Sequence, residues 1–234
     1  MYRVFVYIMK IIERYDYEDL QNIDRPDGRV YVDPHGNELP SVTTILSATK
    51  DMTVLDAWRK RIGEDEANRQ IKHAVNVGNL MHESVERHIL GMERGVKGNF
   101  IHRMAHNMAD KIITHGLSKV DEVWGVEVPL YYPGLYAGRT DLVGVYDGLP
   151  SIMDHKNSKK IKKEEHMEDY YIQCAAYSMA HNHVYGTNIR QGVLFMVGRE
   201  DMSYKTFLLN GDKFDHYYNL WIEKLEQYFD SING

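Results

Sequence analysis

The sequence contains little cysteine, little proline and no excess of positive charge. Cys174 is the one cysteine among 234 residues, which excludes an intramolecular disulfide and any four-cysteine zinc or iron–sulfur site. The 34 acidic residues outnumber the 28 basic ones, so the formal net charge is −6. A polyanionic partner would therefore have to be held by a local basic patch rather than by the charge of the whole chain.

Long apolar runs are also missing. The first twenty residues start with an apolar stretch, but Arg3, Lys10, Glu13 and Arg14 interrupt it. The stretch is too short for a transmembrane helix, it has no signal-peptidase site, and its acidic residues do not suit a mitochondrial presequence. We therefore expect a protein that is neither secreted nor in contact with a membrane.

The remaining composition predicts one globular domain. A hydrophobic content of 43% can supply one substantial core. Residues 1–120 are predicted to be mainly helical, after a turn-rich ribbon around Val30 to Val32. The predicted helices run from a cap at Ser41 or Thr43 towards Ile62, from Glu64 to Leu90, and from Phe100 to His115.

The pattern changes to extended segments in residues 121–234, the predicted catalytic core. Three consecutive antiparallel strands are expected, separated by turns at Pro133-Gly134 and at Asp147 to Pro150. The predicted elements are strands Val123–Tyr132, Leu135–Tyr146 and Ser151–Lys156, helix Glu165–Tyr185, strands Gly192–Val197 and Tyr204–Leu209, and helix Asp212–Phe229. This order predicts an α/β fold with a mixed central sheet flanked by helices and an N-terminal helical elaboration.

Three residues on two of these strands form the strongest chemical signal. Asp154 and Lys156 are two positions apart, so they share a face of their strand, and pairing through the Asp147 to Pro150 turn leaves Asp141 roughly opposite Asp154. Two carboxylates can bind a hard cation such as Mg²⁺, while an ammonium group can hold a nucleophile or stabilise negative charge. Taken alone, however, Asp-x-Lys is usually an ordinary solvated strand face.

Two helical pairs accompany these strands. His82 and Glu86 are four residues apart on one helix face, and Gly78 leaves room there for another element. His82 suits a metal shell containing Mn²⁺ or Mg²⁺, although a surface histidine is the ordinary alternative. Gln173 and Tyr177 form a similar pair after the Asp-x-Lys strand, and are either helix surface and core or a support for the lysine and a contact to phosphate.

Taken in order, these motifs resemble those of a known family. Gly78-x3-His82-x3-Glu86, Gly138-x2-Asp141, Asp154-x-Lys156 and Gln173-x3-Tyr177 look like the series of the RecB-type nucleases, a branch of the PD-(D/E)XK superfamily. From about residue 38 to 230 the chain further resembles the mitochondrial genome maintenance exonucleases and their phage-encoded relatives.

The resemblance implies roles for individual residues. His82, Asp141, Asp154 and the backbone carbonyl of His155 would hold Mg²⁺ or Mn²⁺, with Lys156 as the catalytic lysine. Gln173 and Tyr177 would support the site and the scissile strand. No iron–sulfur cluster is expected, because Cys174 is alone. The residues expected near the substrate are Arg59, Glu86, Glu127, Asn157, Ser158, Lys159, Lys160 and Tyr177. Asn157-Ser158 differs from the pair beginning with threonine that is usual in the family. This difference bears on how the substrate is bound and not on catalysis.

The substrate implied is DNA, single-stranded and with free ends. The lysines at 156, 159, 160, 162 and 163 and the cluster from Trp58 to Arg61 could supply the backbone attraction, although such runs are usually solvated loops. The expected protein is an exonuclease of replication, recombination or repair in the cytoplasm of a bacterial or phage-infected cell, with replication or recombination proteins as partners. A structure-specific endonuclease of the same superfamily and a non-catalytic DNA-binding module are the alternatives. Oligomeric state and digestion polarity are left open.

Overall fold

A six-stranded mixed sheet forms the centre of the molecule. The computed structural model describes residues 10–95 and 98–233, so the apolar start of the chain, on which the expectation about targeting segments partly rests, lies outside it up to residue 9. The strand order is β1-β5-β6-β7-β8-β9, with β1 and β5 parallel, β7 and β8 parallel, and the other neighbours antiparallel. The strands are β1 (Lys10–Ile11), β5 (Val120–Tyr132), β6 (Tyr136–Tyr146), β7 (Leu149–Ser158), β8 (Gly192–Gly198) and β9 (Tyr204–Leu209).

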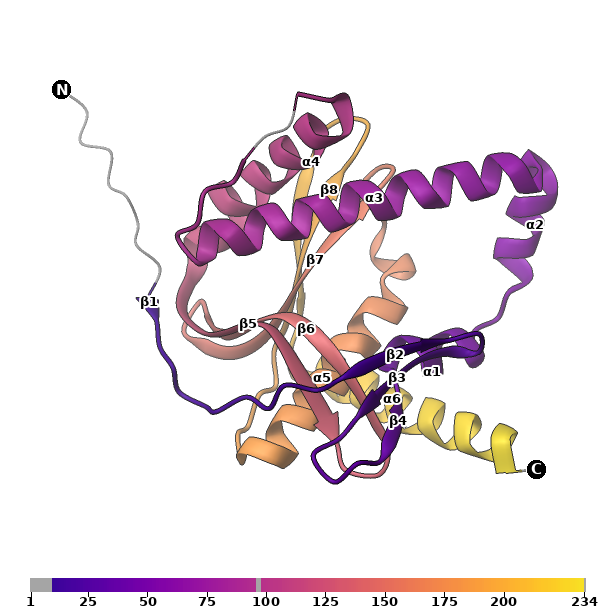
Figure 1. Cartoon of the computed structure of the whole chain (residues 1–234), viewed down its shortest axis with the longest axis vertical. Coiled ribbons are helices and arrows are strands. Elements are labelled where there is room, and N and C mark those ends of the chain that lie inside the picture. The colour runs from indigo at the N-terminus through magenta and orange to yellow at the C-terminus, as the bar shows by residue number, and fades with distance from the viewer. Residues whose placement is uncertain (1–9, 96–97, 234) are drawn as a thin grey trace.

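Helices cover both faces of this sheet (Figure 1). They are α1 (Val42–Ala48), α2 (Thr53–Ile62), α3 (Glu64–Ile89), α4 (Phe100–Lys111), α5 (Glu168–Tyr185) and α6 (Gly211–Asn233). One hydrophobic core lies between the sheet and α1, α5 and α6, and a second lies between the sheet and α3 and α4. Strand β8 is buried along its whole length because both cores enclose it. The predicted α/β class with a flanked mixed sheet is therefore confirmed.

The N-terminal part also contains a small sheet. Strands β2 (Asn22–Arg25), β3 (Gly28–Val32) and β4 (Glu38–Pro40) pair in antiparallel order, as the turn-rich ribbon predicted. Leu20, Tyr31 and Leu39 pack on Ala137 of β6. This contact fastens the small sheet to the hairpin formed by β5 and β6.

The prediction of one helix running towards Ile62 was wrong. Ser41 caps α1 by accepting a hydrogen bond from Thr44 N at 2.9 Å, but the helix ends at Ala48. Asp51 then accepts a hydrogen bond from Thr53 N at 2.9 Å and starts α2 as a separate helix. Because the chain turns between them, α2 and the N-terminal half of α3 stand away from the sheet (Figure 1).

The predicted antiparallel meander is confirmed, but the second turn is shorter than expected. Tyr146 pairs with Leu149, so the turn consists of Asp147 and Gly148 alone, with φ values of 50° and 79°. Positive φ at both central residues is the geometry of a tight two-residue hairpin, and an Asp-Gly sequence favours it.

The helix predicted to reach His115 is shorter than expected. Helix α4 ends at Lys111, and a π-helical turn continues through Gly116.

None of the helices in residues 10–95 and 98–233 combines the length and apolar character needed to cross a bilayer.

Candidate metal and catalytic site

Three acidic residues follow one another across three adjacent strands. Val126 pairs with Leu142 and Val128 with Thr140, so Glu127 of β5 lies opposite Asp141 of β6. On the other side of β6 the last pair is Leu142 with Met153, so Asp141 and Asp154 come next on their strands, in the predicted register. Beyond this pair β6 and β7 diverge (Figure 1). The carboxylates therefore border the gap that opens between the two strands.

Helix α3 brings His82 to this gap. The Nδ1 atom of His82 lies 3.3 Å from Oδ1 of Asp141. The helix can approach β7 closely because Gly78 has no side chain. A Cβ atom at Gly78 would lie 2.6 Å from Nδ2 of Asn157, which itself donates a hydrogen bond to Ala74 O at 3.4 Å. Asn157 thus occupies the space predicted at Gly78. This close contact between α3 and β7 positions His82, one turn further along the helix.

The second oxygen of Asp141 contacts the neighbouring strand. The backbone N–H of His155 donates a hydrogen bond to Oδ2 of Asp141 at 2.6 Å. The His155 ring is buried, 5.6 Å from the ring of Phe195 and 5.7 Å from that of His82, measured between centroids. Asp141 therefore joins α3, β6 and β7 at a single carboxylate.

Lys156 and Asp154 form a buried ion pair. Nζ of Lys156 lies 2.5 Å from Oδ2 of Asp154, whose side chain is 4% exposed. That Oδ2 atom makes no hydrogen bond of ordinary geometry within the described residues. The Lys156 ammonium also lies 5.2 Å from the ring centroid of Tyr170 on α5. Lys156 is therefore held between β7 and α5.

Glu127, Asp141 and Asp154 form an acidic row across β5, β6 and β7, and burial and mutual repulsion shift their pKa values. Burial and the charge of Asp141 raise the pKa of Asp154 to about 6, and the same two causes raise the pKa of Glu127 to about 7. Burial also opposes ionisation of Asp141, but the charges of His82, His155 and Lys156 hold its pKa below the ordinary value. Negative charge in the row is thus only partly compensated by the protein.

The cationic side chains respond to the same carboxylates. Burial opposes the charged form of His82, yet Asp141 and Asp154 outweigh it and raise the pKa of His82 to about 9. Burial likewise opposes the charge on Lys156, and Asp154 and Asp141 raise its pKa above the ordinary value. In the metal-free protein at neutral pH, His82 is an imidazolium and Lys156 an ammonium.

The side chains of His82, Glu127 and Asp141 fit a divalent cation. Each offers one ligand atom, and these atoms lie within 4.8 Å of one another. One imidazole and two carboxylates are suitable ligands for Mg²⁺ or Mn²⁺. The raised pKa values of Glu127 and Asp154 point the same way, because a cation would favour their ionised forms. This group contains Glu127, which was expected near the substrate, and does not include Asp154, which stays a predicted ligand.

Gln173 and Tyr177 support this site from within α5. Nε2 of Gln173 donates a hydrogen bond to the Tyr177 hydroxyl at 3.2 Å, and both side chains are buried. A Cβ atom at Gly138 would lie 2.7 Å from Cε1 of Tyr177. The tyrosine therefore packs beneath β6 rather than facing solvent, so its place favours support of Asp141 over contact with phosphate.

The residues expected near the substrate are dispersed. Asn157 contacts α3, and its Oδ1 accepts a hydrogen bond from Arg199. Ser158 is buried, and its hydroxyl donates a hydrogen bond to the Lys160 carbonyl at 2.5 Å. Arg59 forms an ion pair with Glu64 at 2.7 Å.

The two lysines after Ser158 are exposed, and Lys159 lies 3.3 Å from Glu200. Glu86 is half-buried, and its charge raises the pKa of Glu127. Among them, Glu86 and Glu127 lie at the acidic row.

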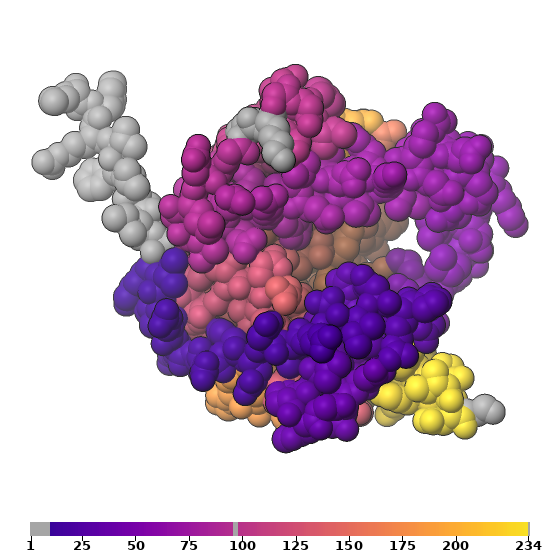
Figure 2. All heavy atoms as spheres, viewed as in Figure 1, coloured from indigo at the N-terminus to yellow at the C-terminus, as the bar shows by residue number. Residues whose placement is uncertain are grey.

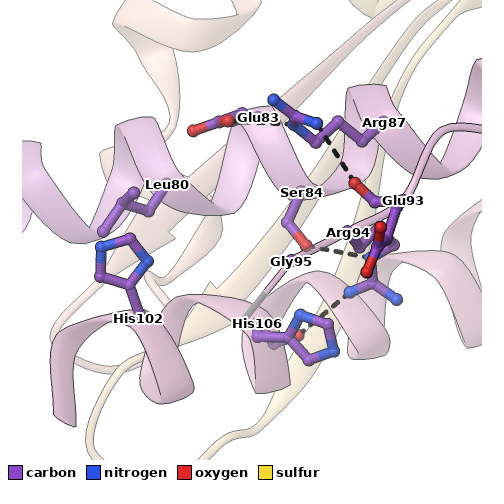
Figure 3. Close-up of a pocket in the computed structure, with 9 residues that line it drawn as sticks. All are labelled: Leu80, Glu83, Ser84, Arg87, Glu93, Arg94, Gly95, His102 and His106. Carbon is purple, nitrogen blue, oxygen red and sulfur yellow. Dashed lines mark hydrogen bonds and ion pairs between the residues drawn. The ribbon is translucent and has the colours of Figure 1, made fainter. Parts of the chain in front are cut away.

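A separate hollow of about 490 Å³ lies between α3 and α4 (Figure 3). Its two arginines are already engaged, Arg94 with Ser84 Oγ at 3.0 Å and His106 O at 3.4 Å, and Arg87 with Glu93 O at 3.2 Å. These contacts fasten the segment after α3 to the two helices. The hollow does not include any residue of the acidic row.

Comparison with known proteins adds to this geometry. No family model matches the chain. Mitochondrial genome maintenance exonuclease 1 of Homo sapiens is 24% identical over 221 residues, covering 90% of this chain and 64% of that protein. The protein of the same name from Xenopus tropicalis is 26% identical over 203 residues, covering 81% and 57%. The chain resembles these exonucleases.

The chain spans about three-fifths of the length of these curated relatives, 64% of one and 57% of the other. A solved structure of a proposed exonuclease from Eubacterium rectale matches with a TM-score of 0.51 and 13% sequence identity. The match covers 68% of this chain and 66% of that one. This match shows a common fold. Together with the sequence likeness it supports a nuclease.

Proposed function

We propose that this chain is a metal-dependent deoxyribonuclease with a PD-(D/E)XK core, and that it degrades single-stranded DNA from free ends. One observation carries the proposal. An imidazole, two carboxylates and the buried ion pair of Asp154 and Lys156 converge where β6 and β7 diverge. This is the combination needed for phosphodiester hydrolysis, and the similar proteins are named exonucleases.

The metal ligands would be His82, Asp141 and Glu127, with Asp154 and the His155 carbonyl beside them. Mg²⁺ or Mn²⁺ bound there supplies Lewis acidity and neutralises charge on a substrate phosphate. His82 must lose its proton before its nitrogen can serve as a ligand. Because the pKa of His82 is raised to about 9, a cation would compete with this proton for the imidazole. The hydrogen bond from His155 N would hold Asp141 in place whether or not a cation is bound.

Lys156 would act as a fixed positive charge. Its pKa lies above the ordinary value, so it cannot accept a proton at neutral pH and is unsuited to the role of general base. An ammonium between Asp154 and the substrate can instead orient the attacking water or stabilise negative charge that develops on the phosphate. Tyr170, beneath the ammonium, limits the positions that it can take.

A passage of mixed charge lies near this lysine. It is a cavity of about 1040 Å³ between α2 and the segment that joins β7 to α5. Its lining combines the ring of Trp58 and the cations Lys50, Arg61 and Lys162 with the carboxylates Asp51, Glu165, Glu168 and Asp169. Figure 2 shows an opening through the molecule beside the helices α2 and α3. Nζ of Lys162 donates a hydrogen bond to the Tyr170 hydroxyl at 3.0 Å, so this passage reaches the side chain under Lys156.

Such a passage favours one strand with a free end, because a strand framed by the chain has to be threaded. Lys50 of this lining pairs with Asp169, so Arg61 and Lys162 are the cations that would contact phosphates, and Trp58 offers a ring on which a base can stack. A role in replication, recombination or repair, with proteins of those processes as partners, would follow from this substrate.

The test uses linear and closed circular single-stranded DNA of equal length. We expect Mg²⁺-dependent degradation of the linear strand, none with EDTA or in Lys156→Ala, and an intact circle. Cleavage of the circle would favour the endonuclease. Equal signals with Mg²⁺, with EDTA and in Lys156→Ala would refute catalysis and leave a DNA-binding module.

A further inference from the structure

Arg139 is a positively charged side chain next to the acidic row that the catalytic proposal does not use. It precedes Asp141 by two residues on β6 and pairs with Pro129 of β5. Successive side chains of a strand alternate between its two sides. Because Gly138 faces Tyr177 of α5, the adjacent Arg139 points to the other side.

The charge of Arg139 acts on Glu127 of the proposed metal group, but Arg139 has only a weak ion-pair partner. It lowers the pKa of Glu127, whose value is otherwise raised by burial and Asp141. Within the described residues, Asp19 is the one carboxylate that forms an ion pair with it, with 4.0 Å between Nη2 and Oδ1. The side chains of Arg139 and Asp19 are 36% and 97% exposed. An exposed pair at this distance contributes little to stability, so a stronger anion can replace it.

The position of Arg139 separates it from the other cations of the site. Lys156 lies on β7 and the passage lies beside the segment that follows it, whereas Arg139 lies on β6. Strands β6 and β7 are paired up to Leu142 and Met153 and diverge beyond that pair. A strand that passes the metal group from the side of Lys156 would next meet Arg139. Tyr131, which pairs with Ala137 one step further along the hairpin, is half-buried and packs against the small sheet.

We propose that Arg139 forms a phosphate-binding subsite on the far side of the metal group, and that it holds the strand beyond the bond to be cleaved. Asp19 occupies the guanidinium in the free protein and is displaced by the phosphate. Guanidinium groups suit this task, because they donate two parallel hydrogen bonds to phosphate oxygens. The inference rests on the proposed function, since it requires single-stranded DNA at this site.

The test measures binding of a fluorescein-labelled oligothymidylate by anisotropy, in the Lys156→Ala background with Mg²⁺, across a series of KCl concentrations. Each phosphate contact on single strands contributes about 0.7 to the slope of log affinity against log salt. We expect Arg139→Gln to weaken binding by about fivefold to tenfold at low salt and to reduce the slope by about 0.7. Arg139→Lys should keep the slope, because the charge remains. Lys119→Gln is the matched control and should change neither quantity, because Lys119 lies just before β5 and pairs with Asp147 of the β6–β7 turn.

The competing carboxylate gives an independent arm. Asp19→Asn should tighten binding by about twofold to threefold in the presence of Arg139 and have no effect in Arg139→Gln. Asp16→Asn makes the same change in net charge from an exposed position of the same segment and controls for a general effect.

If Arg139 only neutralises Glu127, Arg139→Gln will alter metal affinity while the salt slope stays that of the Lys156→Ala parent. That result overturns the subsite and leaves the nuclease in place. Failure of the Lys156→Ala parent to bind the oligonucleotide, with no cleavage by the wild type, overturns both.

Discussion

Replacing Glu127 by glutamine should stabilise the metal-free protein, and by more at high pH than at low pH. Burial and the charge of Asp141 raise the pKa of Glu127 from 4.5 to about 7. The carboxyl therefore binds its proton more tightly in the folded chain than in the unfolded chain, and stability is lost as pH rises from about 4.5 to 7. Since one pH unit corresponds to about 1.4 kcal/mol, the ionised group costs roughly 3 kcal/mol above pH 7.

Glutamine keeps the size of the side chain and removes this cost. In EDTA, the gain in unfolding free energy of Glu127→Gln over wild type should be about 2 to 3 kcal/mol larger at pH 8 than at pH 5. Urea denaturation at both pH values measures it, and Glu223→Gln on the exposed side of α6 should show no such difference. With saturating Mn²⁺ the order should reverse, because the wild type gains the binding energy of the metal. A gain that is equal at pH 5 and pH 8 would show that Glu127 is not strained by its neighbours, and would refute the reasoning.

Three further predictions concern the same site. Lys156→Ala should abolish cleavage while Mn²⁺ binding, followed by paramagnetic resonance, persists, since the lysine is not a ligand. Metal affinity should rise with pH between about 7 and 9, because protons must leave Glu127 and His82, and calorimetry in buffers of different ionisation enthalpy should detect their release. Gly138→Ala should lower the unfolding free energy by about 1 to 3 kcal/mol, since the new methyl group meets the buried ring of Tyr177, and an unchanged urea midpoint would refute that close approach.

Much of the catalytic core could be predicted from the alternation of its strands. Turn sequences and period-two patterns predict the meander of β5, β6 and β7, and with it the position of Asp141 beside Asp154 and Lys156. The spacing of Gly78 and His82 also predicted a helix that packs closely through its glycine. These features depend on residues close together in the chain, and they can therefore be predicted from a single sequence.

What could not be predicted depends on contacts between distant segments. Glu127 was expected near the substrate, yet the β5–β6 register sets it opposite Asp141, and it has a φ of 50° that strand propensity does not foresee. Counting back across the Pro133-Gly134 turn would have found it. Arg139 gave no signal, because its meaning depends on the divergence of β6 from β7 and on the position of Asp19.

The central claim is that His82, Glu127 and Asp141 hold one divalent cation beside Lys156. Titration of Mn²⁺ into the metal-free protein at pH 8, followed by paramagnetic resonance, tests it most directly. We predict one tight site in the wild type, weakened at least tenfold in Asp141→Asn and in Glu127→Gln and unchanged in Glu223→Gln. Absence of a tight site in the wild type, or equal affinity in all four proteins, would contradict the account.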